Sequence, residues 1–294
     1  AITTEPQSVT VCEGSTLSPL TVAYTNGTGT ATYQWFDLTG PIAGATSATY
    51  TPSNTTSNTY YCVITFSSGG CTSVTSDSAV VTINPLPTID NQPLSTQSIC
   101  VGGTIPALTV SYTGGVGTPT YQWFSNTTNN TIGGTAIAGA TTDSYSPPST
   151  SVGTLYYYCE ITFASGGCTS VLSTTAEVII NPLPTVSTQP TTTQSICVGG
   201  TIDPLTVAYT GGVGTATYQW YSNTTNANSG GTLIIGATNS SYTPAAFTTA
   251  GTYYFYATVT LSGNGCGSTT SNTAEVIVVA DPVVDTQALA TQTL

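Results

Sequence analysis

One set of sequence markers occurs three times in the same order, and this repetition constrains the fold more than any other feature. Each copy has a first cysteine, then YQW, GAT and Tyr-x-Pro, and finally a Gly-Cys pair before an apolar segment such as AVVTINPLP. We therefore expect three domains, at residues 1–85, 86–182 and 183–280, which we call repeats 1, 2 and 3. Residues 281–294 match the segment that precedes a first cysteine, so we expect a linker and the start of a further repeat there.

Within a repeat, polar and apolar residues alternate with the period of two that is typical of β-strands, and no helical period is evident. Turn sequences such as NGTG and SSGG separate the predicted strands. In repeat 1 these strands lie near 7–12, 17–25, 31–37, 47–51, 59–67 and 72–83. A Trp on the third strand and a Tyr-x-Cys on the fifth are typical of an immunoglobulin-like sandwich. The expected fold class is all-β, with tandem immunoglobulin-like β-sandwich domains joined end to end by short proline-containing linkers.

The composition excludes several classes of function. The chain has no Lys, Arg or His, 12 acidic residues and a net charge of −12. Without basic side chains it cannot neutralise phosphates, so we expect no nucleic acid partner. No apolar run reaches the roughly 18 residues of a spanning helix, so we expect no membrane insertion. Without His, the Ser and Thr hydroxyls lack an activating base, and we expect no catalytic residue, no cofactor and no enzyme activity.

The cysteines predict disulfides and an oxidising environment. Repeat 3 has only Cys197 and Cys266, so a bridge common to all repeats must join the first cysteine of a repeat to its Gly-Cys cysteine. The predicted pairs are Cys12–Cys71, Cys100–Cys168 and Cys197–Cys266. Because disulfides persist in oxidising compartments, we expect an extracellular protein at the cell surface.

Two further cysteines, Cys62 and Cys159, lie on the predicted fifth strand of repeats 1 and 2, where repeat 3 has Ala257. A buried thiol behaves as a small hydrophobic group, so we interpret both as free core thiols. The alternative is a bridge between Cys62 and Cys71, which would leave Cys12 unpaired and break the match with repeat 3.

The ordered motifs VCEG or ICVGG, LTVAYT, YQWF, GAT with Tyr-x-Pro, YYC, GGCTS and AVVTINPLP resemble the tandem immunoglobulin-like repeats of giant Bacteroidota cell-surface adhesins. They are most similar to the gliding-motility type that the type IX system secretes, and the resemblance covers all three repeats. It implies an extracellular stalk or adhesive filament for surface attachment and gliding motility. The implied partners are neighbouring repeats of the same long chain, the cell-surface motility machinery, and a surface polysaccharide or an abiotic surface. The alternative function is an array of carbohydrate-binding modules in a secreted polysaccharide-degrading protein.

Other candidate sites each have a structural interpretation as well. Trp35, Trp123 and Trp220 could stack on sugar rings, but a Trp at this position is more often in the core, and we assign all three to the core. The Asn-, Thr- and Gly-rich insertions 125–136 and 222–233 are the loops that we would examine first for ligand binding, although simple loop growth explains them too.

The acidic residues give little support for a metal site. Asp90 and Asp285 occupy matching linker positions, and Glu5 and Asp281 lie near other junctions. Calcium needs six to eight oxygen ligands, so one or two carboxylates for each junction are too few, and we expect no metal. Ser78, in Asp77-Ser78-Ala79, fits the O-glycosylation pattern that the resemblance to Bacteroidota proteins implies, and it is a candidate modification site.

Overall fold

The computed structural model describes residues 1–67 and 73–285, and every regular element in this part of the chain is a β-strand. Within the described residues, ten strands occur in each repeat in the same order. In repeat 1 they are β1 Ile2–Thr4, β2 Val9–Cys12, β3 Leu20–Thr21, β4 Ala23–Tyr24, β5 Ala31–Asp37, β6 Gly40–Pro41, β7 Thr49–Tyr50, β8 Asn58–Phe66, β9 Val74–Thr75 and β10 Ala79–Asn84.

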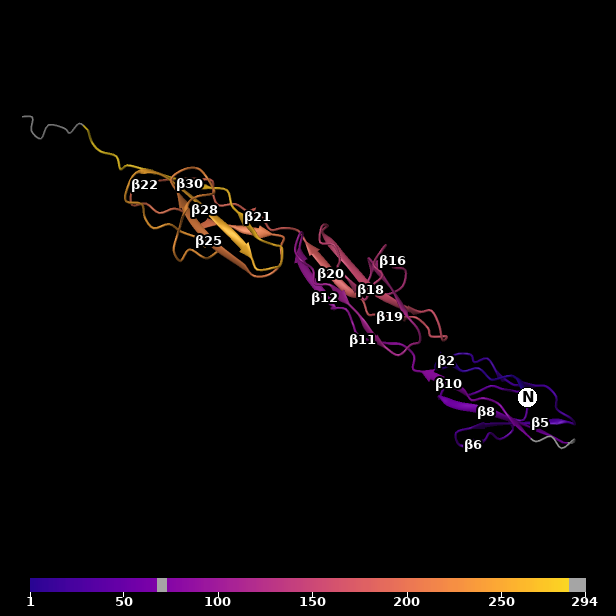
Figure 1. The fold of residues 1–294 in the computed structure, drawn as a ribbon. Coiled ribbons are helices and arrows are strands. Elements are labelled where there is room, and N and C mark those ends of the chain that lie inside the picture. The colour runs from indigo at the N-terminus through magenta and orange to yellow at the C-terminus, as the bar shows by residue number, and fades with distance from the viewer. Residues whose placement is uncertain (68–72, 286–294) are drawn as a thin grey trace, which may run out of the picture. The chain divides into compact units, whose positions relative to one another are not determined.

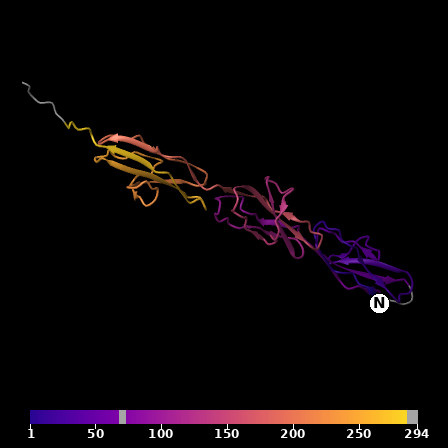
Figure 2. The same ribbon diagram turned by 90° about the horizontal axis from the view of Figure 1, so that it is seen from above.

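The strands of the other two repeats follow the same pattern, and each repeat is built from one contiguous stretch of chain (Figures 1 and 2). In repeat 2 they are β11 Thr88–Asn91, β12 Thr96–Cys100, β13 Leu108–Thr109, β14 Ser111–Thr113, β15 Pro119–Asn126, β16 Thr135–Ala136, β17 Ser144–Tyr145, β18 Gly153–Phe163, β19 Val171–Leu172 and β20 Ala176–Asn181. In repeat 3 they are β21 Thr185–Thr188, β22 Thr193–Cys197, β23 Leu205–Thr206, β24 Ala208–Thr210, β25 Ala216–Asn223, β26 Thr232–Leu233, β27 Ser241–Tyr242, β28 Gly251–Leu261, β29 Ser268–Thr270 and β30 Ala274–Val279.

Each repeat is an immunoglobulin-like β-sandwich, as the alternating pattern predicted. In repeat 1 the larger sheet has the order β2-β10-β8-β5-β6, with β9 also pairing with β8, and the pairs β1–β4 and β3–β7 form the other layer. Repeats 2 and 3 have the same arrangement, with larger sheets β12-β20-β18-β15-β16 and β22-β30-β28-β25-β26 (Figure 1). The first strand of each larger sheet, β2 or β22, runs parallel to the last strand of its repeat.

The alternation of side chains builds the core between the two layers. Along β8, Tyr60, Cys62 and Ile64 are buried on one face, and they cluster with Trp35 of β5 and with Leu20 of the opposite layer. Repeat 3 forms the equivalent cluster around Trp220. The β-branched and aromatic residues of these strands suit a pleated surface of which one face is buried.

A buried serine interrupts the last strand of each repeat, which the sequence pattern predicted as one strand, 72–83 in repeat 1. The Ser76 hydroxyl accepts a hydrogen bond from the Cys62 N–H at 2.9 Å and donates to the Asp77 carbonyl at 2.9 Å. Ser173 and Ser271 make the same two contacts in the other repeats. The hydroxyl thus satisfies a strand N–H at the point where the ladder breaks between β9 and β10.

The chain divides into two compact units, which are treated separately below. The first comprises Ala1–Thr96, Ala107–Ser146 and Leu155–Glu177, and the second comprises Gln97–Pro106, Pro147–Thr154 and Val178–Leu294. Each unit contains one junction between consecutive repeats. None of the described residues belongs to a helix long and apolar enough to cross a bilayer.

Replacing Ser173 by Ala should destabilise repeat 2 and leave the stability of repeats 1 and 3 unchanged. The substitution leaves the buried Cys159 N–H without its partner, at a cost of about 1–3 kcal/mol. Hydrogen exchange measured by mass spectrometry should therefore be at least about fivefold faster in β18 peptides. Peptides from β8 and β28 serve as internal references, and the exposed Ser151→Ala variant is the control. Unchanged β18 exchange in S173A would contradict this role for the serine.

Candidate functional site: disulfide junctions between consecutive repeats

Two disulfides join different repeats rather than the two ends of one repeat. Cys12 of repeat 1 is bonded to Cys168 of repeat 2, with a Cα–Cα distance of 5.1 Å. Cys100 of repeat 2 is bonded to Cys266 of repeat 3, with a Cα–Cα distance of 4.9 Å. In both, the first cysteine of one repeat bonds to the Gly-Cys cysteine of the following repeat.

The predicted pairing within repeats is therefore wrong for these four cysteines. Cys100 and Cys168, which the sequence pattern paired with each other, each have a partner in another repeat. Cys197, predicted to bond to Cys266, is free and exposed. Cys71, the predicted partner of Cys12, lies outside the described residues.

Strand topology explains the correction. In repeat 3, the parallel pairing of β22 with β30 places Cys197 opposite Val279, where the last strand ends. The antiparallel pairing of β28 with β30 places Gly251 opposite Val278, so β28 starts at this same end. The eleven residues of β28 then span roughly 35 Å to Leu261, beyond which Cys266 lies. A disulfide requires Cα atoms within about 7 Å, so the two cysteines of one repeat cannot meet.

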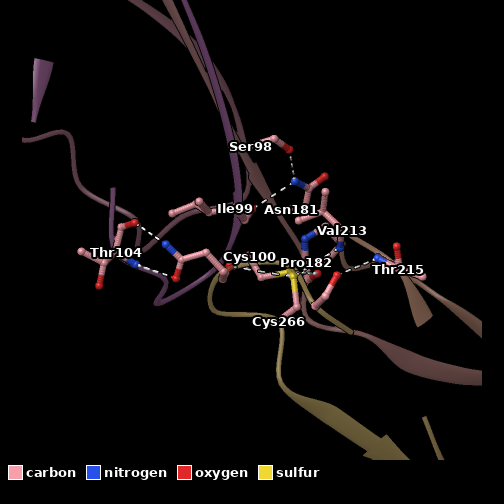
Figure 3. The surroundings of a disulfide bond; sticks show 11 residues. Ser98, Ile99, Cys100, Thr104, Asn181, Pro182, Val213, Thr215 and Cys266 are labelled. Carbon is pink, nitrogen blue, oxygen red and sulfur yellow. Dashed lines mark hydrogen bonds between the residues drawn. A yellow bond between two sulfur atoms is a disulfide. The ribbon is translucent and has the colours of Figure 1, made fainter. Parts of the chain in front are cut away.

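The second junction shows how the Gly-Cys hairpin of one repeat fits the turn of the preceding repeat (Figure 3). The Cys100 N–H donates to the Asn264 carbonyl at 2.8 Å. The Asn264 side-chain amide donates to the Thr104 carbonyl at 2.5 Å and accepts from the Thr104 N–H at 3.3 Å. Cys266 Sγ accepts the Val213 N–H at 3.3 Å. The contacts with Cys100 and Thr104 fix the hairpin in one register against the turn that follows β12, and the Val213 contact holds Cys266 within repeat 3.

Glycines permit this close approach. A Cβ on Gly103 would lie 2.8 Å from the Asn264 carbonyl oxygen, and one on Gly265 would lie 2.5 Å from the Gly103 Cα. Any side chain at either position would push the hairpin away from the turn. Gly103 and Gly265 therefore serve this junction.

The disulfide also packs in an apolar environment. Cys100 and Cys266 form a buried cluster with Leu261, which the half-buried Tyr209 and Val213 adjoin. Cys100 is fully buried and Cys266 is 2% exposed. Reductants in solvent therefore have little access to this bond.

The first junction repeats the key contacts in its own unit. The Cys12 N–H donates to the Gly166 carbonyl at 2.6 Å, and the Ser15 hydroxyl donates to the same carbonyl at 3.1 Å. A Cβ on Gly167 would lie 2.5 Å from the Ser15 Oγ. A cavity of about 590 Å³ lies beside this contact, lined by Val9–Val11, Gly14–Thr16 and Gly166–Gly167.

At each junction the peptide linker passes next to the disulfide. Cys12 Sγ lies 3.9 Å from the Pro85 carbonyl oxygen, and Cys100 Sγ lies 3.5 Å from that of Pro182. Glycines of the following repeat bind the same carbonyls, with Gly115 N–H to Pro85 at 3.0 Å and Gly212 N–H to Pro182 at 2.8 Å. Two covalent connections therefore run side by side through each junction.

Cys62, Cys159 and the three tryptophans lie in the cores. Cys62 and Cys159 are buried and form no disulfide, and burial raises the pKa of Cys62 to about 11 and that of Cys159 to about 12. Trp35, opposite Cys62 in the ladder, is fully buried, as are Trp123 and Trp220. The indole N–H groups are satisfied by backbone carbonyls, as in the 2.8 Å bond from Trp35 to Ser47.

The inserted loops 125–136 and 222–233 are held by their own asparagines. The Asn126 side-chain amide donates to the carbonyls of Asn130 and Ile132, each at 3.1 Å. Asn223 makes the matching bonds to Ala227 at 2.9 Å and Ser229 at 3.1 Å. Ile132 at the tip of the first loop is 83% exposed. Ligand binding by these loops stays a prediction.

The candidate acidic and hydroxyl sites are scattered. The Glu5 carboxylate accepts the Asp77 N–H at 2.8 Å, and the Asp90 carboxylate accepts the Thr113 hydroxyl at 2.9 Å. Within residues 1–67 and 73–285 no group of three or more His, Cys, Asp or Glu residues could hold a metal ion. Ser78 is exposed, and its glycosylation stays a prediction.

Comparison with solved structures gives several tandem arrays of domains. A titin I-band fragment, I67-I69, has a TM-score of 0.48 at 14% identity, covering 96% of this chain and 98% of that one. Sidekick-1 immunoglobulin domains 1-5 have a TM-score of 0.45 at 16% identity, with 96% and 59% covered. Mouse cadherin-23 EC22-24 has a TM-score of 0.42 at 14% identity, with 95% and 97% covered. At these scores the likeness supports no statement about function.

None of the curated proteins compared with the chain matches it. A family model does match, and it does so three times in succession, at residues 2–85, 91–182 and 186–280. Together these matches cover most of the sequence. The chain therefore belongs to the family described as a domain of unknown function, DUF8696, of which it contains three consecutive copies.

Proposed function

We propose that the chain is an extracellular repeat segment of a giant bacterial surface adhesin, in which junction disulfides help consecutive repeats to bear load. In this function the repeats form a stalk or adhesive filament that serves surface attachment and gliding motility. The partners would be neighbouring repeats of the same long chain, the cell-surface motility machinery and a polysaccharide or abiotic surface. Secretion by the type IX system belongs to the same proposal.

The observation that most supports this function is the pair of disulfides that join successive repeats. Disulfides form and persist outside the reducing cytoplasm, which supports an extracellular location. A bond that ties one domain to the next adds nothing to a catalytic or ligand site within a domain. It is useful where the connection between domains must survive force or proteolysis.

The strand arrangement at the exit from repeat 1 suits load sharing. Cys12 ends β2 and pairs in register with Asn84 of β10, the strand that leads into the linker. Tension through the disulfide pulls on β2, and tension through the linker pulls on β10. Because the two strands are parallel and end side by side, the disulfide and the linker pull both in the same direction, and neither strand bears the tension alone.

The carbohydrate-binding alternative receives less support. Trp35, Trp123 and Trp220, the aromatic residues first considered for sugar stacking, are fully buried with their N–H groups bonded. Contact with a polysaccharide would fall to the inserted loops, whose polar backbones are exposed on repeats 2 and 3. The proposal therefore assigns surface contact, where this segment makes any, to residues 125–136 and 222–233.

Cutting the linker should leave repeats 1 and 2 connected. A recognition site for a sequence-specific protease, inserted after Leu86, allows the peptide chain to be cleaved between the two repeats. On a non-reducing denaturing gel the cleaved chain should run as one species, because Cys12–Cys168 still joins the parts. Addition of a reductant should separate them. The same insertion in a Cys12→Ser/Cys168→Ser variant is the matched control and should separate at once. Separation of the unsubstituted chain without reductant would contradict the proposed second connection.

The adhesin assignment itself is tested on cells that produce the protein. Antibodies raised against residues 1–294 should label intact cells and should reduce their attachment and gliding. After reduction, the labelled polypeptide should run at several hundred kilodaltons on a denaturing agarose gel. A band near the 29.9 kDa of this segment, or labelling only after permeabilisation, would overturn the assignment.

A further inference from the structure

The outer face of the larger sheet differs between the repeats. In repeat 1 we call it the open face, and its apolar side chains, on the adjacent strands β6, β5, β8 and β10, are Pro41, Phe36, Tyr61, Val63 and Val80. Phe36 pairs with both Pro41 and Tyr61 in the ladders, and the rings of Phe36 and Tyr61 stack with their centroids 5.1 Å apart. Val80 is 47% exposed. Repeat 1 therefore presents apolar side chains from four adjacent strands to solvent.

In repeats 2 and 3 the inserted loops cover the equivalent position. Tyr158 and Tyr256, the counterparts of Tyr61, are each only 4% exposed, whereas Tyr61 is half-buried. The Gly231 N–H donates to the Tyr256 hydroxyl at 3.0 Å, and a Cβ on Gly134 would lie 2.6 Å from the Tyr158 hydroxyl oxygen. The short turn between β5 and β6 of repeat 1 contains no segment of this kind, so its aromatic pair is left uncovered.

The inserted loops also reach the start of the last strand. The Thr175 hydroxyl donates to the side-chain carbonyl of Asn129, and the Thr273 hydroxyl donates to that of Asn226. Their counterpart in repeat 1, Ser78, is exposed. Each loop thus extends over the sheet from its tyrosine to its last strand, and repeat 1 lacks this whole cover.

The three outer faces differ in charge as well. Val80 is replaced by Glu177 in repeat 2 and by Glu275 in repeat 3, and each glutamate accepts a hydrogen bond from a neighbouring tyrosine. Val63 is replaced by Glu160 in repeat 2. Within the described strands of repeat 1, every outward position of the larger sheet is uncharged. The open face therefore lacks the carboxylates that the other two faces carry.

Asp37, at the end of β5, does not change this. Its carboxylate accepts the Thr39 N–H at 2.8 Å and the Asn58 side-chain amide at 3.2 Å. Asn58 lies two residues before the buried Tyr60 on β8, and residues two apart on a strand share a face. The carboxylate is therefore turned toward the inner side of the sheet, away from the open face.

We propose that two copies of this chain pair through the open face, with repeat 1 of one copy packed face to face against repeat 1 of the other. The chain has 12 acidic residues and no basic residue, so two copies repel each other wherever their carboxylates meet. The open face lets apolar side chains meet without bringing carboxylates together. Removal of these side chains from water then favours the pair.

The size of the open face predicts a weak and reversible pair. The strands β2, β10, β8 and β5 lie about 4.8 Å apart, so the face covers roughly 450 Å², and two copies would bury roughly 900 Å². Stable specific interfaces bury at least about 1,200 Å². We therefore expect a Kd between about 10 µM and about 1 mM. Many copies held side by side would strengthen the contact through multivalency.

Sedimentation equilibrium of the full chain tests the proposal. At concentrations up to about 1 mM, in about 0.5 M NaCl to screen the repulsion between copies, the chain should pass reversibly from monomer to dimer. Val80→Glu and Val63→Glu should each raise the Kd at least about tenfold, because each would bury an unpaired carboxylate in the pair. Both variants should fold, since Glu177 and Glu160 occupy these positions in repeat 2. Ser151→Glu adds the same charge at an exposed position of repeat 2 and should dimerise like the unsubstituted chain.

Three results would overturn pairing through the open face. The first is a chain that stays monomeric throughout the concentration series, and the second is an unchanged Kd in Val80→Glu. The third is an equal loss of dimer in Ser151→Glu, which would indicate a general effect of charge. A monomeric chain that binds cellohexaose in a calorimetric titration, and loses this binding in Val80→Glu, would assign the face to a neutral polysaccharide. All these measurements use the isolated chain, so their failure would leave the cell-surface assignment to the antibody and gel experiments.

Discussion

The parallel pairing of each repeat's first cysteine-bearing strand with its last strand determines what can happen at the junctions. Because β2 lies along β10 and ends with it, Cys12 is placed where the chain leaves repeat 1. The Gly-Cys hairpin follows an antiparallel strand and so lies at the other end of the sandwich. A first cysteine can then meet only the hairpin of the following repeat. The disulfide, the glycine contacts and the course of the linker beside the sulfur atoms all follow from this one ladder.

Much of the sandwich could be predicted from sequence, because alternation and turn residues are local signals. The strands near 31–37 and 59–67, the core position of Trp35 and the equivalence of the three repeats needed no long-range information. The disulfide partners did need it. Because the three copies have equivalent cysteines, the sequence fits disulfides within repeats and disulfides between neighbouring repeats equally well. Only the direction of the strands distinguishes the two sets of pairs. The serine break in the last strand was also missed, since Ser173 reads as an ordinary polar residue until its hydroxyl is seen to bond the Cys159 N–H.

The cysteines of this chain thus serve two different physical purposes. Cys62 and Cys159 pack beside tryptophans as small apolar groups, where burial raises their thiol pKa and Ala257 can replace them in repeat 3. Cys12, Cys100, Cys168 and Cys266 lie at the ends of the sandwiches, where they connect one domain to another. In a chain without Lys, Arg or His, side-chain ion pairs are unavailable for this purpose. Backbone contact through glycine and a covalent sulfur bridge take their place.

The most direct test of this account is disulfide mapping of the native chain, with free thiols alkylated before digestion. Trypsin finds no site in this sequence. Chymotrypsin cleaves after aromatic residues and, more slowly, after leucine, and cleavage after Leu94 and Leu172 separates Cys71 from Cys100 and Cys168 from Cys197. The account predicts that the peptide containing Cys12 is joined to the one containing Cys168, and the Cys100 peptide to the Cys266 peptide. A bond between Cys12 and Cys71, or between Cys100 and Cys168, would contradict this account, because it would place the disulfides within single repeats.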